Sequence, residues 1–426
     1  MHAEPILILV SFTLLLSYLS SLLYSKTKIP DIAWLMLLGL IVGPGLNLFN
    51  KYLFLELAPM MSILALTIIL FEAGINVDIE MLFETMGKSL LLSATSLLTV
   101  ITVIGLTINY LLPGEFTLLQ AMLLGAMIGG SSTVSVYAVL ESLSRVVENM
   151  LSTRVLLTME SIISDPLCIV ASITFIKMIM EPQTSLLESI RDIFSVFSLS
   201  TIFGLGAGIL WAKILNRLRG RSMLYMLTLS ALIPTYIASE HFIGEGGGAM
   251  TALAFGLSIT NYKWVMEKFG VSVKSYIDRK KIREFHEEVT FFIKSFFFVY
   301  IGLIVSINKQ YAIYGTGIAL LLMLIRYLVV TGLDQFIPFT LEERTISKYV
   351  FAMGLPAFVM SQLPMIYDPN KIHFVNPSIY PDLCMPIVLG TVLYSSLLGP
   401  LVIKREMKTQ EQPTEDNQQS NPNNKS

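Results

Sequence analysis

Long apolar runs separated by short polar segments dominate the sequence. A run of about 20 apolar residues is long enough to cross a bilayer as a helix. We place thirteen candidate spans, at residues 5–24, 31–49, 57–75, 87–112, 117–139, 155–180, 193–215, 222–239, 247–260, 289–307, 311–333, 347–363 and 383–403. The pattern predicts an all-α polytopic membrane protein with about 13 transmembrane helices. The polar tail, residues 404–426, is predicted to be disordered and cytoplasmic.

Composition and charge support this interpretation. Of the 426 residues, 54% are hydrophobic and only 14% are charged, whereas a soluble domain carries about 25% charged residues. With thirteen spans and a cytoplasmic C-terminus, the cytoplasmic segments hold 22 of the 29 Lys and Arg residues and the outer loops hold 5. Basic residues favour the cytoplasmic side, so we expect a cell-membrane protein with its N-terminus outside. The net charge of −2 gives no indication of a nucleic-acid partner.

The sixth span carries acidic and hydroxyl side chains in an otherwise apolar run. Residues 156–169 read LLTMESIISDPLCI. Each carboxylate costs about 2.5–3.5 kcal/mol at the centre of a spanning helix, and such residues usually face a bundle interior or a water-filled cavity. Positions four apart share a helix face, so Ser161 lies on one face with Asp165. Glu160 and Ser164 share the neighbouring face.

Proline adds a further polar atom to this span. Pro166 has no N–H, so the carbonyl of Ile162 loses its helical partner. Carboxylate, hydroxyl and carbonyl oxygens together suit a small hard cation. The alternative is a polar contact that only holds two helices together. Two acids favour the ion site, because hydroxyls alone suffice for such a contact.

Two other spans contain interruptions at membrane depth. Residues 125–133 read GAMIGGSST, and residues 353–362 read MGLPAFVMSQ. Unwound backbone inside a membrane is tolerated only within protein or beside a cavity. Corresponding broken helices in two halves indicate the inverted repeat of a transporter. The alternative is that Gly and Pro are simply common in membrane helices.

Three further charged residues lie in apolar runs. Arg326 in span 11 needs an acidic partner, and Glu160 is the natural candidate, since Asp165 must stay free if it cycles between proton and cation. Lys294 in span 10 is predicted to extend towards the cytoplasm. Glu72 in span 3 is ambiguous between a residue at the membrane edge and an ion ligand.

These stretches resemble a known family. The segment MESIISDPLCIV is similar to the E-S-x-x-N-D-[AP] signature in helix 6 of the NhaP-type sodium/proton antiporters and their eukaryotic sodium/proton exchanger relatives. Other stretches resemble the same family in the expected order, namely KIPDIAWLMLLGLIVGP, LFEAGINVD, GGGAMTALAFGLSITN, FFFVYIGL and MGLPAFVMSQLP.

The resemblance implies an inverted-repeat antiporter fold over residues 1–403. Each protomer of a homodimer would contain a dimerisation bundle of spans 1–3 and 8–10 and a mobile core of spans 4–6 and 11–13. Spans 5 and 12 would be two crossed broken helices.

The resemblance also implies roles for individual residues. Asp165 matches the ion-binding aspartate of the family, and Glu160 and Arg326 match its structural ion pair. Two positions depart from the pattern, since Ser164 replaces the usual asparagine and the T-D-P of broken helix 5 lacks its carboxylate here. The predicted Na⁺ site comprises Asp165, Ser161, Glu72, Ser131 and Ser132, with Ser164 and Thr133 supporting it.

The predicted function is exchange of Na⁺ or Li⁺ for H⁺, electroneutral and by alternating access at a buried aspartate. The missing carboxylate makes K⁺/H⁺ exchange the main alternative, and a cation channel is less favoured because no filter sequence is present. The sequence lacks G-x-x-x-x-G-K-[ST], H-E-x-x-H and G-x-S-x-G motifs, so we expect neither an enzyme nor a cofactor. The expected partners are a monovalent cation, a proton and membrane lipid.

Overall fold

A computed structural model describes residues 3–27, 29–46, 51–77, 79–132, 136, 139–140, 143, 150–183, 186–218, 224–244, 246–268, 270–271, 277–305 and 308–411. This part of the chain forms helices and contains no strand. The helices of the first half are α1 (Ala3–Thr27), α2 (Asp31–Leu40) with the π-helical η1 (Ile41–Gly45), α3 (Lys51–Asn76), α4 (Ile79–Leu111), α5 (Leu118–Met127), α7 (Leu151–Met180) and α8 (Leu186–Arg217). Those of the second half are α9 (Leu224–Phe242), α10 (Gly247–Thr260), α11 (Tyr262–Lys268), α12 (Arg279–Ile304), α13 (Lys309–Leu333), α14 (Leu341–Tyr349), α15 (Leu355–Ser361), α16 (Leu363–Tyr367), α17 (Ile379–Leu393), the π-helical η2 (Tyr394–Leu398) and α18 (Gly399–Glu411).

Most of these helices coincide with an apolar run of the sequence, but several helix ends lie outside those runs. Five helical stretches among the described residues are long and apolar enough to cross a membrane, namely Met86–Leu111, Leu151–Met180, Phe194–Arg217, Lys309–Leu333 and Ile379–Met407. Helix α12 begins ten residues before the predicted span 289–307. Asp278 is the N-cap of this helix, because its side chain accepts hydrogen bonds from the N–H groups of Lys280 and Lys281. Such a cap sets the start of a helix whether or not the following residues are apolar.

The C-terminal tail differs from the prediction. Helix α18 continues to Glu411, into the segment 404–426 that the sequence predicts to be disordered, while residues 412–426 lie outside the described residues. Ile403 is fully buried in a small apolar cluster with Ile346 and Val350, and Met407 packs against that cluster. Because positions four apart share a helix face, these two contacts favour continued helix.

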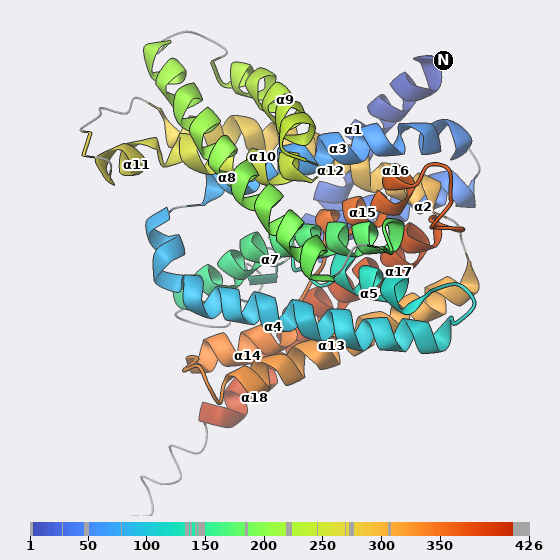
Figure 1. The fold of residues 1–426 in the computed structure, drawn as a ribbon. Coiled ribbons are helices and arrows are strands. Elements are labelled where there is room, and N and C mark those ends of the chain that lie inside the picture. The colour runs from blue at the N-terminus through green and yellow to red at the C-terminus, as the bar shows by residue number, and fades with distance from the viewer. Residues whose placement is uncertain are drawn as a thin grey trace, which may run out of the picture.

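The helices pack in two groups (Figure 1). One group contains α3, α8, α9, α10 and α12, together with α1 and α2. The other contains α4, α5, α7, α13, α14 and α17. Helix α15 contacts both groups, and one large apolar cluster includes residues from both of them.

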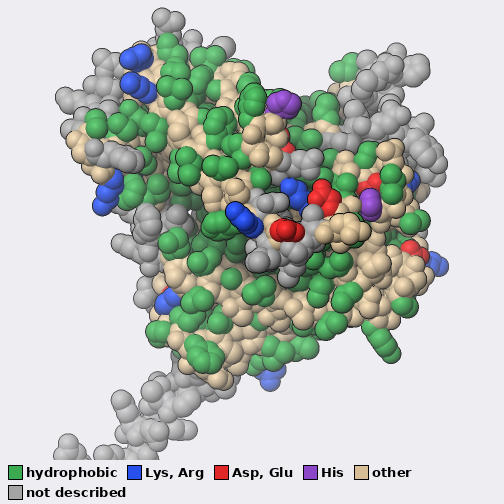
Figure 2. Space-filling model, in the orientation of Figure 1, with side chains coloured by type: hydrophobic (Ala, Val, Ile, Leu, Met, Phe, Trp, Pro, Cys, Tyr) green, Lys and Arg blue, Asp and Glu red, His purple; other side chains and the backbone are tan. Residues whose placement is uncertain are grey.

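The outer surface is rich in apolar side chains. Figure 2 shows a face over which hydrophobic side chains are spread widely, while charged side chains are few, with acidic ones towards the middle and right and basic ones scattered out to the edges. Leu98 of α4, Ile202 of α8 and Leu320 of α13 are each more than half exposed. Soluble monomers rarely expose apolar surface this extensively, so this surface fits contact with lipid.

Close packing of α8 on α10 depends on glycine. A Cβ atom at Gly204 would lie 2.5 Å from the carbonyl oxygen of Thr251 and 2.9 Å from Cβ of Ala254. Gly206, two residues along the same helix, has no atom within 4 Å of such a Cβ. Small residues let membrane helices approach closely.

Gly204→Val is therefore expected to destabilise the protein, whereas Gly206→Val is the matched control and should melt close to wild type. Overpacking a tight contact costs about 1–3 kcal/mol. The measurement is the thermal unfolding midpoint of the purified protein in detergent. Equal midpoints for the two variants would contradict the α8–α10 contact.

Candidate cation-binding site

The polar stretch of α7 lies inside the bundle. Glu160, Ser161, Ser164 and Asp165 are all buried, and α7 stays helical through Pro166. The fourfold spacing noted in the sequence therefore places these side chains on inward-facing surfaces of one helix.

The first chain interruption meets α7. Helix α5 ends at Met127, and residues 128–132 are not helical. The N–H of Ser131 donates to Oγ of Ser164 (3.2 Å), and Oγ of Ser161 donates to the carbonyl oxygen of Ser131 (2.7 Å). Oγ of Ser131 is buried without a hydrogen-bond partner among the described residues. Thr133 lies outside the described residues.

The second chain interruption meets the first. Residues 350–354 separate α14 from α15. The N–H of Ser132 donates to the carbonyl oxygen of Ala352 (2.7 Å), and a Cβ atom at Gly354 would overlap the Ser132 side chain. Glycine at this position is what allows the two non-helical segments to touch. The structure thus brings together the two interruptions that the sequence indicated.

A small cavity lies beside this contact. Its volume is about 120 Å³, and its polar lining residues are Glu72, Asn76, Ser132, Thr158, Asp165 and Lys294. A water molecule occupies about 30 Å³ in the liquid, so an unhydrated or partly hydrated monovalent cation fits this volume. Asp165, Ser132 and Glu72 therefore share one cavity, whereas Ser161, Ser164 and Ser131 are hydrogen-bonded to one another and do not line it.

Glu72 forms an ion pair with Lys294. Nζ of Lys294 lies 2.6 Å from Oε2 of Glu72, and both side chains are less than one-fifth exposed. The structure pairs Lys294 with a partly buried carboxylate of the neighbouring α3, a partner that we did not predict from the sequence, and its extension towards the cytoplasm stays a prediction. The signal was present in the sequence as two lone opposite charges in apolar runs, which usually pair.

Glu160 and Arg326 form a fully buried ion pair. The guanidinium binds both carboxylate oxygens, with 2.7 Å from Nη2 to Oε2. Arg326 also donates from Nε to the carbonyl oxygen of Ser347 (2.7 Å) and from Nη1 to Oγ of Ser96 (3.3 Å). Neither member of the pair lines the Asp165 cavity. The arrangement joins α7, α13, α4 and α14 at one point.

The sequence matches a known family and is similar to several of its named relatives. The family described as "Sodium/hydrogen exchanger, transmembrane" matches residues 11–408. The K⁺/H⁺ antiporter NhaP2 of Shewanella sp. strain ANA-3 is 26% identical over 390 residues, covering 88% of this chain. The chain spans 64% of the length of that relative. The probable Na⁺/H⁺ antiporter 2 of Methanocaldococcus jannaschii is 24% identical over 439 residues, covering 94% of this chain and all of that protein.

A solved structure has the same fold. The sodium proton antiporter MjNhaP1 of Methanocaldococcus jannaschii, determined at pH 8, superposes with a TM-score of 0.78 at 22% sequence identity. The match covers 93% of this chain and 99% of that one. The two chains therefore share an architecture.

Proposed function

The chain belongs to the transmembrane sodium/hydrogen exchanger family, and from this premise we propose that it exchanges a monovalent cation, Na⁺ or Li⁺, for H⁺ across the cell membrane. The observation that carries the proposal is the buried carboxylate of Asp165 in a small cavity beside two touching chain interruptions. Cation and proton compete for this one carboxylate, because a cation needs its oxygens deprotonated. Either ligand neutralises the charge, which lowers the barrier to moving the site through a low-dielectric region.

The oxygens around Asp165 supply the remaining ligands. Ser132 lines the cavity, and the buried Oγ of Ser131 has no hydrogen-bond partner within the described part of the chain. Ser161 and Ser164 hold the Ser131 backbone in place. Hydroxyl and carboxylate oxygens suit hard cations. Glu72 contributes to this site when its carboxylate is not held by Lys294.

Alternating access requires part of the bundle to move. In this proposal spans 4–6 and 11–13 form a mobile core with crossed broken helices in spans 5 and 12, and spans 1–3 and 8–10 form the dimerisation bundle of a homodimer. Both broken spans begin with a capping box, at Thr117 before α5 and at Thr340 before α14, which is consistent with related halves.

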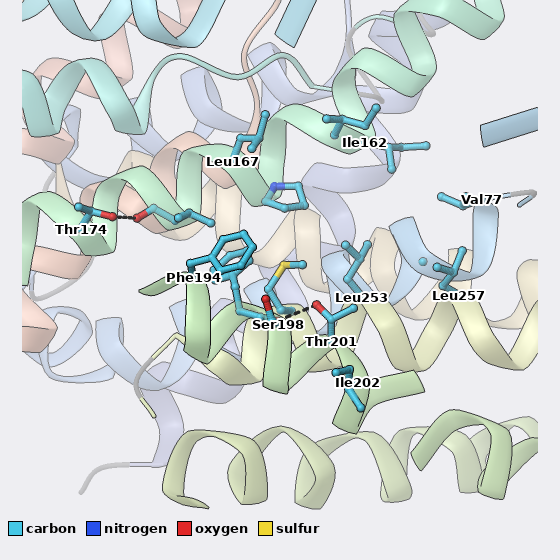
Figure 3. Close-up of a pocket in the computed structure, with 16 residues that line it drawn as sticks. Val77, Ile162, Leu167, Thr174, Phe194, Ser198, Thr201, Ile202, Leu253 and Leu257 are labelled. Carbon is cyan, nitrogen blue, oxygen red and sulfur yellow. Dashed lines mark hydrogen bonds between the residues drawn. The ribbon is translucent and has the colours of Figure 1, made fainter. Parts of the chain in front are cut away.

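An apolar cavity lies along α7, a helix of the proposed mobile core. It has a volume of about 700 Å³ and lies between α7 and helices α8 and α10 (Figure 3). Its lining includes Ile162 and Leu167 from α7, Phe194 from α8 and Leu253 from α10. An interface of this kind has few polar contacts to break, so α7 can shift against α8 and α10 at low cost.

We infer the stoichiometry from the charges at the site and the orientation from the distribution of basic residues along the chain. Arg326 stays matched to Glu160 throughout, so one cation is exchanged for one proton and transport is electroneutral. The distribution of Lys and Arg favours an orientation with the N-terminus outside and the C-terminus in the cytoplasm.

K⁺/H⁺ exchange is the second candidate. It is favoured by the hydroxyl side chains of Ser131 and Ser132 at a position where the family pattern has a carboxylate. Fewer charged ligands bind a small ion less tightly. A relative with 26% identity is named a K⁺/H⁺ antiporter.

The test is proton flux in proteoliposomes with an acidic lumen and an internal pH dye. We expect the lumen to become alkaline when Na⁺ or Li⁺ is added outside. The change in luminal pH on adding K⁺ decides between Na⁺/H⁺ and K⁺/H⁺ exchange. Clamping the membrane voltage should leave the rate unchanged if exchange is electroneutral. If no cation drives proton flux in a well-folded sample, the proposed function is wrong.

A further inference from the structure

A second cavity adjoins the Asp165 cavity. It has a volume of about 260 Å³, and its charged lining residues are Asp31, Glu72, Glu287 and Lys294. Both cavities are lined by Glu72 and Lys294. The ion pair between these two residues therefore stands between the space beside Asp165 and the space beside Asp31 and Glu287.

The second cavity leads to the surface. Glu287 is exposed, and Asp31 is half-buried at the start of α2. Glu287, Phe291 and Lys294 recur at helical spacing along α12, so they lie on one face of that helix. A carboxylate at the surface is thus followed, two turns deeper along the same face, by the ammonium group of Lys294.

Lys294 has a second carboxylate within the same cavity. It is bonded to Glu72 at 2.6 Å, and Asp31 lines the 260 Å³ cavity together with both members of this pair. A lysine ammonium is a compact charge on a flexible four-carbon stem, so it can exchange one carboxylate partner for another without backbone movement.

We propose that Lys294 is a tethered cation that competes with the transported cation for the charge of the Asp165 cavity. This inference rests on the proposed function. In the empty site the ammonium group neutralises Glu72. When a cation enters, the ammonium group turns towards Asp31 and Glu287, which frees the carboxylate of Glu72 to attract the cation alongside Asp165. Lys294 thereby sets the cation affinity of the site without binding the cation itself.

The test compares the cation affinity of the full-length protein and its variants. Affinity is read in two ways, from the Na⁺ concentration that half-saturates thermal stabilisation in detergent and from the Na⁺ concentration that half-saturates exchange in proteoliposomes. Lys294→Met removes the charge and keeps the length of the side chain. We expect its half-saturating concentration to fall about tenfold, since removing a unit charge a few ångström away changes binding by at least that factor.

The matched control is a second Lys–Glu pair between helices. Nζ of Lys88 lies 3.2 Å from Oε2 of Glu343, outside both cavities, so Lys88→Met should leave the Na⁺ affinity at the wild-type value. In the double variant Glu72→Gln/Lys294→Met the gain in affinity should disappear, because the freed carboxylate is gone. An unchanged or weaker affinity in folded Lys294→Met would overturn the proposal.

Asp31→Asn is a second, independent test of the proposal. It also serves if Lys294→Met does not fold. It removes the alternative partner of Lys294, so we expect Na⁺ affinity to weaken about threefold, as a partly screened charge would produce. Wild-type affinity in this variant would overturn the exchange of partners. The proposed function fails separately, when wild type itself gives neither Na⁺-dependent stabilisation nor exchange.

Discussion

Asp165→Asn is expected to abolish cation-driven proton flux. The amide keeps the size and shape of the side chain, but it carries no charge for a cation and accepts no proton. Removing one charged partner of a buried ion costs about 3 kcal/mol or more, which corresponds to a loss of about 100-fold or more in affinity. The measurement is the initial rate of luminal alkalinisation in proteoliposomes at matched protein content.

The control for this variant is another aspartate in an ion pair. Asp334, at the end of α13, accepts from Arg344 at 3.2 Å and does not line the Asp165 cavity. Asp334→Asn should retain exchange close to the wild-type rate. Asp165→Glu should retain some exchange, because it keeps the carboxylate at a shifted position. Flux in Asp165→Asn above one-tenth of the wild-type rate would place the exchanging carboxylate elsewhere.

The part of the site on α7 was predictable because one helix carries it. The fourfold spacing of Ser161 and Asp165 fixes their shared face wherever the helix lies. The partner of Glu160 followed from the cost of leaving Arg326 unpaired in an apolar run, and the structure pairs these two side chains.

The interruptions could also be located in advance. A glycine pair and an internal Gly-Leu-Pro disfavour continuous helix wherever they lie in the fold, and the structure has non-helical segments at both places. Their contact was not predictable from spacing alone. It depends on the N–H of Ser132 meeting the carbonyl of Ala352, more than 200 residues away in the chain, and no local pattern encodes such a pairing.

The Glu72–Lys294 pair was missed because each residue had a plausible local explanation. Glu72 ends an apolar run, and Lys294 lies close enough to a predicted helix end for its side chain to extend to the interface. The structure places α3 against α12, and this packing makes the pair. Helix ends beyond the apolar runs, as in α12 and α18, were missed because capping and amphipathic contacts set them.

Arg326→Gln is expected to destabilise the protein strongly. It leaves the carboxylate of Glu160 buried and unpaired, and breaking a buried ion pair by removing one partner costs about 3–5 kcal/mol. It also removes the hydrogen bonds to Ser347 and Ser96, which hold α14 and α4 against α13. The measurement is the thermal unfolding midpoint in detergent, together with the fraction of protein that elutes as a single species.

Two further variants separate charge from packing at this pair. Glu160→Gln/Arg326→Gln removes both charges, so it should recover part of the lost stability, because no buried charge remains unpaired. Lys263→Gln is the surface control, since Lys263 and Glu267 form an exposed pair and such pairs contribute at most about 1 kcal/mol. If Arg326→Gln melts with wild type, the pair does not hold the core together. If the double variant folds and still exchanges cation for proton independently of voltage, Glu160 and Arg326 are structural, and electroneutral exchange depends on Asp165 alone.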